Sequence, residues 1–315
     1  MKSNMRSKYS LIFIASNLRQ LLIFFLLKYK YKDKVFYIFD NNIPKRIKNR
    51  FSHVSVRMGK NIFDLVFYKF LYGIMFFIFN VIFRLDGLDV YGSDHIMGAK
   101  FFLRRNKFYL IEDGTINYTK KAYIRSWKNK LFSIPTFGVH SNVKEIYLTK
   151  PAAEEMPDIV KSKVKVIDIN KLWQCLSIEE KGEILSIFDL SKEMINSVHD
   201  RKYILFTQPL SEDKVLSEEE KISLYRDIIN DYGEENIVIK CHPREVTDYS
   251  VVFSNAIIFP EHIPAELLSL LQVDIKKVIT LFSTAVYDFP EDKIDFRGTI
   301  VHNSLVAKYG IIKLF

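Results

Sequence analysis

The fold is decided by residues 9–39, which read YSLIFIASNLRQLLIFFLLKYKYKDKVFYIF. The apolar run at 9–15 predicts a buried strand, and a short polar loop at 16–17 follows it. A helix is expected at 18–30 and a second strand at 35–39. Strand, helix and strand at this spacing form a βαβ unit, so a parallel sheet begins at the start of the chain.

The same alternation continues through the rest of the chain. The clearest helix is expected at 218–232, where apolar residues recur on one face and acidic residues occupy the first turn. Short apolar or β-branched runs bounded by polar residues predict further strands at 88–91, 108–111, 145–149, 164–167, 203–206, 237–239, 256–259 and 278–280. The pattern predicts an α/β fold with parallel sheets in both halves.

Two domains are expected from the length. The chain has 315 residues, about twice the common domain size. The polar stretch 190–200 precedes a predicted strand and is the expected crossing point. We therefore expect an N-terminal domain at 1–195 and a C-terminal domain at 196–315.

Composition excludes several classes of protein. The chain is 48% hydrophobic, which excludes a disordered chain, and its 11 Gly and 9 Pro exclude collagen-like or low-complexity sequence. Cys175 and Cys241 are the two cysteines, so neither a disulfide framework nor a cysteine-rich zinc site is possible. A reduced, intracellular setting is expected.

Charge is divided unequally along the chain. The net charge of +9 hides a balance of +18 over residues 1–150, with 27 Lys and Arg against 9 Asp and Glu. Residues 151–315 carry 19 basic and 28 acidic residues, a balance of −9. Opposite signs suggest different partners, and the basic, apolar half favours an anionic membrane surface or a polyanion. Low-GC codon bias is the alternative reading.

The segment 61–83 is the strongest candidate for membrane contact. Between Lys69 and Arg84 lie 14 uncharged residues, which as a helix span about 21 Å, less than a hydrocarbon core of about 30 Å. With basic flanks at 45–50, Arg57 and Lys60, an interfacial helix is expected; a purely buried helix and a true span are the alternatives. The expected location is cytoplasmic, peripheral on the inner face of the cytoplasmic membrane.

Chemically unusual residues follow several predicted strands, where open α/β sheets bind their ligands. Glu112, Asp113 and Gly114 follow the strand at 108–111, and acid beside acid suits a general base, although Asp-Gly is also ordinary turn chemistry. After the strand at 203–206, a polar loop contains three candidate site residues, Thr207, Gln208 and Asp213. Asp213 is a second candidate base, and a plain loop is the alternative.

Three further strand ends carry candidates for binding a phosphate or a ribose. His242, Pro243 and Arg244 follow the strand at 237–239, where proline aims the imidazole and His and Arg can hold an anion. Alternatively, Arg244 pairs with Glu245 for structural reasons. Ser283 and Thr284 open a predicted helix and suit a phosphate, or else form a simple N-cap. Near the start of another predicted helix, the carboxylate of Glu266 could bind ribose hydroxyls.

Motifs for metals and nucleic acids are missing from the sequence. There is no HExxH, paired CxxC, DxD, Walker A or GxGxxG pattern. No module for DNA or RNA is recognisable either. We expect no metal, no cofactor and no nucleic-acid partner.

Taken in this order, the strand-end motifs resemble glycosyltransferase family 52, which includes bacterial lipooligosaccharide and capsule sialyltransferases. The likeness lies in Glu112-Asp113-Gly114, similar to the D/E-D/E-G motif, and in His242-Pro243-Arg244, similar to the HP motif. The blocks 207–213 and 282–290 resemble two further family segments. Asn17 and Gln20 lie where the family has a strand-to-helix loop near the acceptor, and the resemblance covers about residues 8–310.

The resemblance implies a metal-independent GT-B arrangement, with two Rossmann-like domains whose parallel sheets face a central cleft. The donor would be CMP-N-acetylneuraminic acid, held by the C-terminal domain, and the acceptor a terminal galactose of a lipooligosaccharide or capsule glycan. The reaction would invert the anomeric centre, with His242, Ser283 and Thr284 neutralising the leaving CMP phosphate. A homodimer is consistent with the family.

The resemblance leaves two questions open. The block 207–213 implies that Asp213 is the general base, whereas related sialyltransferase families place the base in the D/E-D/E-G motif, at Asp113; Asp213 is slightly preferred. Another family 52 transferase, such as a glucosyltransferase using a UDP-sugar, is one alternative function. A non-catalytic membrane-associated component of surface-polysaccharide assembly is the other.

Overall fold

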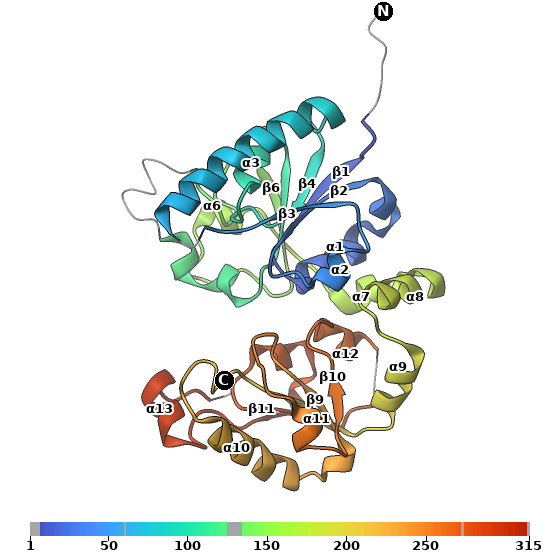
Figure 1. The fold of residues 1–315 in the computed structure, drawn as a ribbon, viewed down its shortest axis with the longest axis vertical. Helices are drawn as coiled ribbons and strands as arrows, with labels where there is room; N and C mark the ends of the chain where they lie inside the picture. The colour runs from blue at the N-terminus through green and yellow to red at the C-terminus, as the bar shows by residue number, and fades with distance from the viewer. Residues whose placement is uncertain (1–6, 60, 125–133, 272–273, 314–315) are drawn as a thin grey trace, which may run out of the picture. The chain divides into compact units, whose positions relative to one another are not determined.

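The chain forms two compact units, Met1–Ile187 and Phe188–Phe315. The computed structural model describes residues 7–59, 61–124, 134–271 and 274–313. Each unit contains one parallel sheet with helices, and each is described by itself (Figure 1). This is the α/β architecture with two parallel sheets that the sequence predicts.

The N-terminal unit is built on seven parallel strands in the order β3-β2-β1-β4-β5-β6-β7. Chain direction across the sheet reverses between β1 and β4, so the carboxyl ends of these two strands flank the switch point at which such folds bind ligands. The strands are β1 (Leu11–Ala15), β2 (Val35–Asp40), β3 (His53–Val56), β4 (Asp89–Gly92), β5 (Phe108–Ile111), β6 (Val143–Leu148) and β7 (Val164–Val166).

Helices lie on both faces of this sheet, which is why every residue of β1 is buried. Phe13 stacks on Phe24 of α1 with ring centroids 4.1 Å apart, while Ile12 and Ile14 enter the cluster on the opposite face. The helices are α1 (Leu18–Lys28), α2 (Lys45–Lys48), α3 (Ile62–Phe83), α4 (Ala99–Leu103), α6 (Asp158–Lys161), α7 (Ile169–Gln174) and α8 (Ile178–Ile187).

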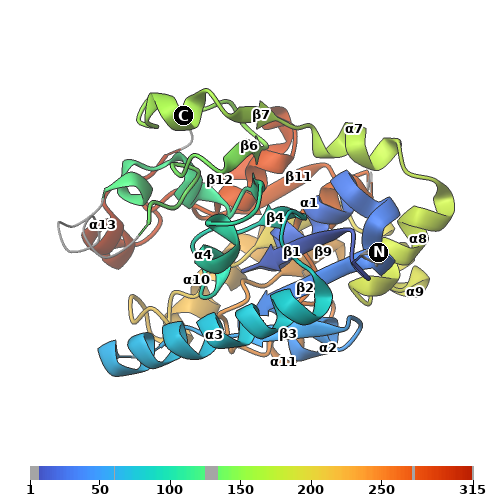
Figure 2. The ribbon, with the colours of Figure 1, turned by 90° about the horizontal axis from the view of Figure 1, so that it is seen from above.

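The predicted apolar helix is α3, and it runs along the outside of the N-terminal unit (Figures 1 and 2). Asn61 begins it by accepting a hydrogen bond from the Asp64 amide over 2.8 Å. Among the described residues it is the one helix long and apolar enough to cross a membrane. Only Tyr72 and Phe76 of its residues are buried, so the purely buried alternative is wrong.

The C-terminal unit has five parallel strands in the order β10-β9-β8-β11-β12, with its switch point between β8 and β11. Ser217 and Glu220 form a capping box that begins its longest helix, α10. The strands are β8 (Tyr203–Phe206), β9 (Ile237–Lys240), β10 (Ile257–Phe259), β11 (Lys277–Thr280) and β12 (Ile294–Phe296). The helices are α9 (Lys192–His199), α10 (Glu218–Asn230), α11 (Tyr249–Val252), α12 (Glu266–Leu270) and α13 (Asn303–Tyr309).

The division between the units lies at Ile187 and Phe188, earlier in the chain than the expected 195. The stretch 190–200, expected as a polar crossing, is largely the helix α9. Leu190 and Val198 are buried there, which makes this segment part of the C-terminal unit.

Candidate functional site

The carboxyl edge of the N-terminal sheet is held together by Gln20, whose side chain is fully buried. Its Oε1 accepts a hydrogen bond from the Ser16 amide after β1, and its Nε2 donates to the Ile111 carbonyl at the end of β5, both over 2.9 Å. Asn17 begins α1 by accepting from the Gln20 amide over 2.9 Å. Gln20, predicted to bind substrate, instead fixes two strand ends relative to each other.

The carboxylate of Asp113 is the focus of this edge. Its Oδ1 accepts hydrogen bonds from Ser16 Oγ over 2.5 Å and from Asn17 Nδ2, and its Oδ2 lies 3.0 Å from His95 Nε2. The side chain is 15% exposed, so the carboxylate is oriented by the protein and still reaches solvent. Gly114 follows with φ +89°, a conformation that favours glycine and turns the chain away from Asp113.

His95 comes from the loop after β4, the strand between β1 and β5 in the sheet, and it was not among the residues predicted from the sequence. Gly92 allows this loop to form, because a Cβ there would lie 1.9 Å from the Ile14 carbonyl oxygen. The His95 ring stacks on Phe137, with centroids 4.5 Å apart. The signal in the sequence is an Asp-His pair just beyond a predicted strand.

Two carboxylates flank the His95 imidazole. Nε2 faces Asp113, and Nδ1 lies 3.9 Å from Oδ1 of the buried Asp94, which accepts the amides of Phe137 and Gly138. Burial alone would lower the pKa of His95, but the hydrogen bond and charge of Asp113, helped by Asp94, outweigh burial and raise it. The imidazole is therefore poised to hold a proton beside Asp113.

Glu112 serves a different purpose from its neighbour. It is 3% exposed, and its Oε2 accepts hydrogen bonds from the Thr149 amide over 2.6 Å and from the Tyr118 hydroxyl over 2.7 Å. Its Oε1 lies 3.0 Å from Arg19 Nη2. The carboxylate predicted to bind substrate thus joins the end of β6 to α1 and to the loop after β5.

In the C-terminal unit, Thr207 and Gln208 tie together the strand ends around the switch point. The Thr207 hydroxyl donates to Glu245 over 2.6 Å, and Gln208 Oε1 accepts from the Phe282 amide over 3.1 Å. The Gln208 amide donates to the buried Tyr225 hydroxyl over 2.7 Å. These contacts join the ends of β8, β9 and β11.

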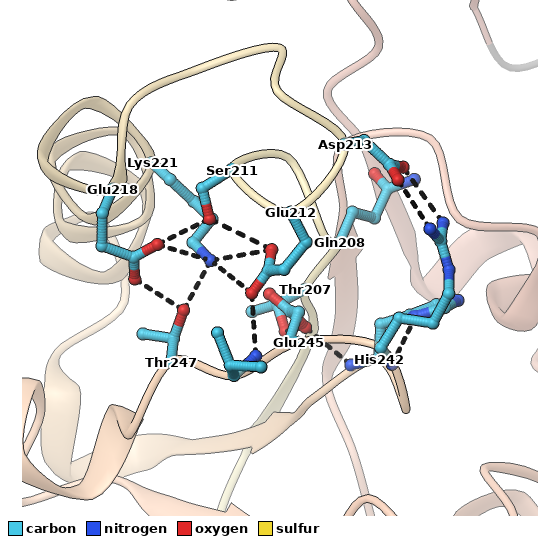
Figure 3. Close-up of polar contacts among 12 residues, drawn as sticks. Thr207, Gln208, Ser211, Glu212, Asp213, Glu218, Lys221, His242, Glu245 and Thr247 are labelled. Atoms are coloured by element: carbon cyan, nitrogen blue, oxygen red, sulfur yellow. Dashed lines mark hydrogen bonds and ion pairs between the residues drawn. The ribbon is translucent and has the colours of Figure 1, made fainter.

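A fully buried lysine organises the two loops at this edge (Figure 3). Lys221 lies 3.2 Å from Glu212 Oε2 and 3.1 Å from Glu218 Oε2, and it also donates to the Thr247 hydroxyl. Glu212 in turn accepts the Val246 amide over 2.8 Å. The loop after β8 is thereby fastened to the loop after β9, and the sequence analysis did not identify this network.

Asp213, in the loop after β8, pairs with Arg244, in the loop after β9. Arg244 donates from Nη1 to Oδ1 over 2.6 Å and from Nη2 to Oδ2 over 3.0 Å. The hydrogen bond and charge of Arg244 hold the pKa of Asp213 below its ordinary value. Both oxygens are occupied, but the side chains are 30% and 59% exposed, so such a pair is weak and can exchange partners.

The backbone beside His242 fixes the tautomer of its neutral ring. The Arg244 amide donates to His242 Nδ1 over 3.1 Å, so the neutral ring carries its proton on Nε2. Burial, followed by the charges of Arg244 and Lys240, lowers the pKa of His242. The exposed Pro243 lies within this turn, and the His242 amide donates to Glu245 over 2.6 Å.

Lys240, at the end of β9, is a second cation of this edge that the sequence analysis did not identify. It is 4% exposed and donates to the Cys241 and Pro260 carbonyls over 3.1 and 3.3 Å. Burial lowers its pKa to about 8. Glu266, the candidate ribose ligand, is also buried, and its charge acts on Lys240.

Ser283 and Thr284 follow β11, as predicted, but a 3-10 helix of five residues, Thr284–Asp288, begins there rather than an α-helix. Ser283 Oγ accepts from the Ala285 amide over 3.3 Å, as expected of a capping residue, and Thr284 is exposed. The short element lacks the aligned amides of an α-helix, so a phosphate here would depend on the two hydroxyls. Within the described residues, no cluster of three His, Cys, Asp or Glu could hold a metal.

Comparison with known proteins identifies the family. The model of glycosyltransferase family 52 matches residues 20–305. The chain belongs to glycosyltransferase family 52. A relative in Haemophilus influenzae, described as an uncharacterized protein, is 47% identical over 303 residues, covering 95% of this chain and 98% of the relative.

Solved structures agree with the fold of this family 52 chain. The GT-B domain of a sialyltransferase from Photobacterium damselae is similar with a TM-score of 0.61 at 13% identity, over 95% of this chain and 94% of that one. A 2,6-sialyltransferase from a Photobacterium species, solved with CMP and lactose, is similar with a TM-score of 0.59 at 12% identity, over 91% of this chain and 71% of that one. The family 52 chain is thus a glycosyltransferase with a GT-B-like fold.

Proposed function

We propose that this glycosyltransferase moves sialic acid from CMP-N-acetylneuraminic acid to a terminal galactose of a bacterial surface glycan, with inversion. The His242–Arg244 turn is the observation that carries the proposal. A neutral imidazole with its proton on Nε2, an arginine and the buried Lys240 gather at one strand end. That set suits a leaving group with one phosphate. Family membership and the fold shared with two sialyltransferases support the same donor.

We assign the phosphate to His242 Nε2 and the guanidinium of Arg244. Arg244 would exchange Asp213 for the phosphate, since its present pair is exposed and bidentate binding suits both anions. Ser283 and Thr284, at the neighbouring strand end, add hydroxyl donors. With one phosphate to stabilise, these donors can do the work that a metal does for a diphosphate, and we propose that no metal is needed.

We assign the general base to Asp113 rather than Asp213, which reverses the slight preference from the sequence. Asp213 pairs with Arg244 in the ligand-free protein, which lowers its pKa, and it would lose that partner when the phosphate binds, so the assignment rests on the geometry of Asp113. Asp113 is oriented by three donors and reaches solvent. Its partner His95, between two carboxylates, would position it and balance its charge.

The proposed step is one displacement. The galactose hydroxyl oxygen bonds to the anomeric carbon of the sialic acid as the bond from that carbon to the phosphate oxygen breaks. The hydroxyl proton passes to Asp113, and the electron pair of the broken bond leaves on CMP. His242 and Arg244 stabilise the charge that develops on that phosphate.

The first experiment is a donor panel in EDTA with lactose as acceptor and the free nucleotide as readout. CMP release from CMP-N-acetylneuraminic acid alone supports the proposal. Release of UDP from a UDP-sugar would identify a different transferase of the family. Turnover of no donor, by protein that still protects itself from unfolding when CMP is added, would favour a non-catalytic role.

The second experiment compares Asp113→Asn with Asp213→Asn. We expect kcat to fall by about a hundredfold or more in Asp113→Asn, with CMP affinity unchanged. Asp213→Asn should lower kcat much less, and it should bind CMP at least as tightly as the parent does, because Arg244 is released from its pair. The reverse ranking would make Asp213 the base.

A further inference from the structure

The outer face of α3 is an apolar surface with no partner among the described residues. Phe63 is 83% exposed and Phe70 is 69% exposed, values typical of polar surface residues. The charged residues of the helix are Asp64 and Lys69. Together the eleven exposed apolar side chains form the outer α3 face: Ile62, Phe63, Val66, Phe67, Phe70, Leu71, Ile74, Phe77, Ile78, Val81 and Ile82. An apolar patch of this extent marks an interaction surface.

The inner face of α3 packs along the sheet and fixes how the helix can meet a partner. Tyr72 and Phe76 are buried in the main cluster of the N-terminal unit, and Leu65, Phe79 and Phe83 pack against it. This packing reaches from the first turn to the last. With 22 residues the helix is about 33 Å long, enough to cross a bilayer, but crossing would take the sheet into the hydrocarbon. The outer α3 face can therefore meet a membrane only by lying parallel to it.

A groove of about 560 Å³ separates α3 from α4 and the loops beside it. Its polar lining is basic, with Lys69 from α3 and Lys100, Arg104 and Arg105 from α4 and the residues after it. None of the described residues that line the groove is acidic. A Cβ at Gly73, on the α3 side, would have no atom within 4 Å, so glycine keeps the groove open there.

We propose that the outer α3 face lies in the interface of a bilayer containing anionic phospholipid, and that the groove between α3 and α4 takes the phosphate of a lipid headgroup. Apolar side chains beside a cluster of cations are the combination that binds such surfaces. The groove supplies the cations, and the outer α3 face supplies apolar side chains along the whole helix. This inference does not depend on which sugar the enzyme transfers.

Charge complementarity selects the membrane over a second copy of the chain. An isologous dimer through α3 would bring the same surface from each protomer together. A second copy would thus add a second basic groove to the interface, with Lys69, Arg104 and Arg105 from each protomer and no acid from the described lining residues. Anionic lipid supplies that balancing charge.

The test is sedimentation of the full-length protein with vesicles of phosphatidylcholine alone or mixed with phosphatidylglycerol. We expect binding to the mixed vesicles. The variant Phe63→Gln/Phe70→Gln/Ile82→Gln should weaken it by about tenfold or more, because each side chain loses apolar burial. The matched control, Ile178→Gln/Val251→Gln, removes equally exposed apolar side chains elsewhere and should bind as the parent does.

Separate variants test the groove between α3 and α4. Arg104→Gln/Arg105→Gln should remove most of the preference for phosphatidylglycerol, whereas Lys165→Gln/Lys171→Gln, which removes two exposed lysines elsewhere, should not. Gly73→Leu fills the groove and should weaken binding to phosphatidylglycerol vesicles without lowering the melting temperature, since a helix-interior glycine is replaced by a better helix former. Unchanged binding in Gly73→Leu would overturn the headgroup site.

Light scattering without lipid decides between the two occupants. A dimer that persists on dilution, is broken by the triple Gln variant and fails to bind either vesicle would overturn the proposal in favour of a second copy. Equal binding to both vesicle types would overturn the role of the cations. Binding of the triple variant at parental strength would overturn the role of the outer α3 face.

Discussion

The amide of Arg244 donates to Nδ1 of His242 over 3.1 Å, so the backbone decides which nitrogen of the imidazole faces outward with a proton. Gln can place an amide N–H near the position of Nε2, whereas Asn places one near Nδ1. We expect His242→Gln to lose about tenfold in CMP affinity and His242→Asn clearly more, because a charge-assisted hydrogen bond to the phosphate is worth about 1.5–3 kcal/mol. Calorimetric titration with CMP measures both. Equal losses would mean that Nε2 does not hold the phosphate.

The affinity for a CMP-sugar should increase as the pH falls. Burial and nearby cations lower the pKa of His242 in the free protein, and a bound phosphate would raise it again. Binding then takes up a proton, so affinity rises as pH falls through the pKa of the complex and becomes constant below the pKa of the free protein.

A phosphodiester donor is the right probe for this dependence, because it keeps one charge throughout the range. The Asp113→Asn background should slow turnover enough for the titration. His242→Gln in that background should abolish the slope. A slope that persists in His242→Gln would assign the proton to another group.

Lys221→Met should destabilise the C-terminal unit by about 3 kcal/mol, because it leaves two carboxylates without their buried cation. Unfolding in urea measures the loss, and Lys192→Met, at an exposed helical position, is the control. Adding Glu212→Gln and Glu218→Gln should recover part of the stability. A neutral effect of Lys221→Met would show that the network does not hold these loops.

The network around Lys221 also predicts how the free energy of unfolding depends on pH in the acid range. Burial would raise the pKa of Glu212 and Glu218, but hydrogen bonds, including those from Lys221, outweigh it and lower both. A carboxylate with a lowered pKa stabilises the fold above its unfolded pKa, about 4.3, and loses that contribution as pH falls towards the folded pKa. We expect a steeper loss of stability below that pH in the parent than in Lys221→Met, measured by urea midpoints across the acid range.

His95→Leu should lower kcat by up to about a hundredfold with little change in CMP affinity, because Asp113 loses one of the donors that orient it. His95→Gln can still donate to Oδ2 and should recover much of the rate. The pH dependence of kcat gives a second readout, since His95 titrates with a raised pKa and Gln does not titrate. A similar loss in both variants, with the pH profile unchanged, would indicate a structural role for the ring.

Strands buried on both faces were predictable because a short, unbroken apolar run fits few structures other than a buried strand. The βαβ unit from β1 to β2 is the clearest case. β3 was missed because it lies at the sheet edge and three of its four residues are partly or fully exposed. β12, with the sequence Ile-Asp-Phe, was missed as well.

The site was predictable as a set of strand ends but not as a set of contacts. Glu112 and Gln20 stand where the motifs place them, yet their partners, Thr149 and Ile111, come from distant parts of the chain. His95 was missed for the same reason, since Gly92-Ser93-Asp94-His95 resembles an ordinary turn until β4 and β5 bring it beside Asp113. Local patterns identify the edge, and only the sheet order decides which residues meet there.

The packing of α3 along its sheet has a geometric consequence. Asp113 and α3 belong to one compact unit, so once the helix lies flat on a lipid surface, the height of the carboxylate above that surface is set by the fold. A glycan anchored in the same surface then reaches Asp113 only if its stem matches that height. The enzyme would then select acceptors by the length of the glycan between the lipid and the terminal sugar, as well as by the terminal sugar itself.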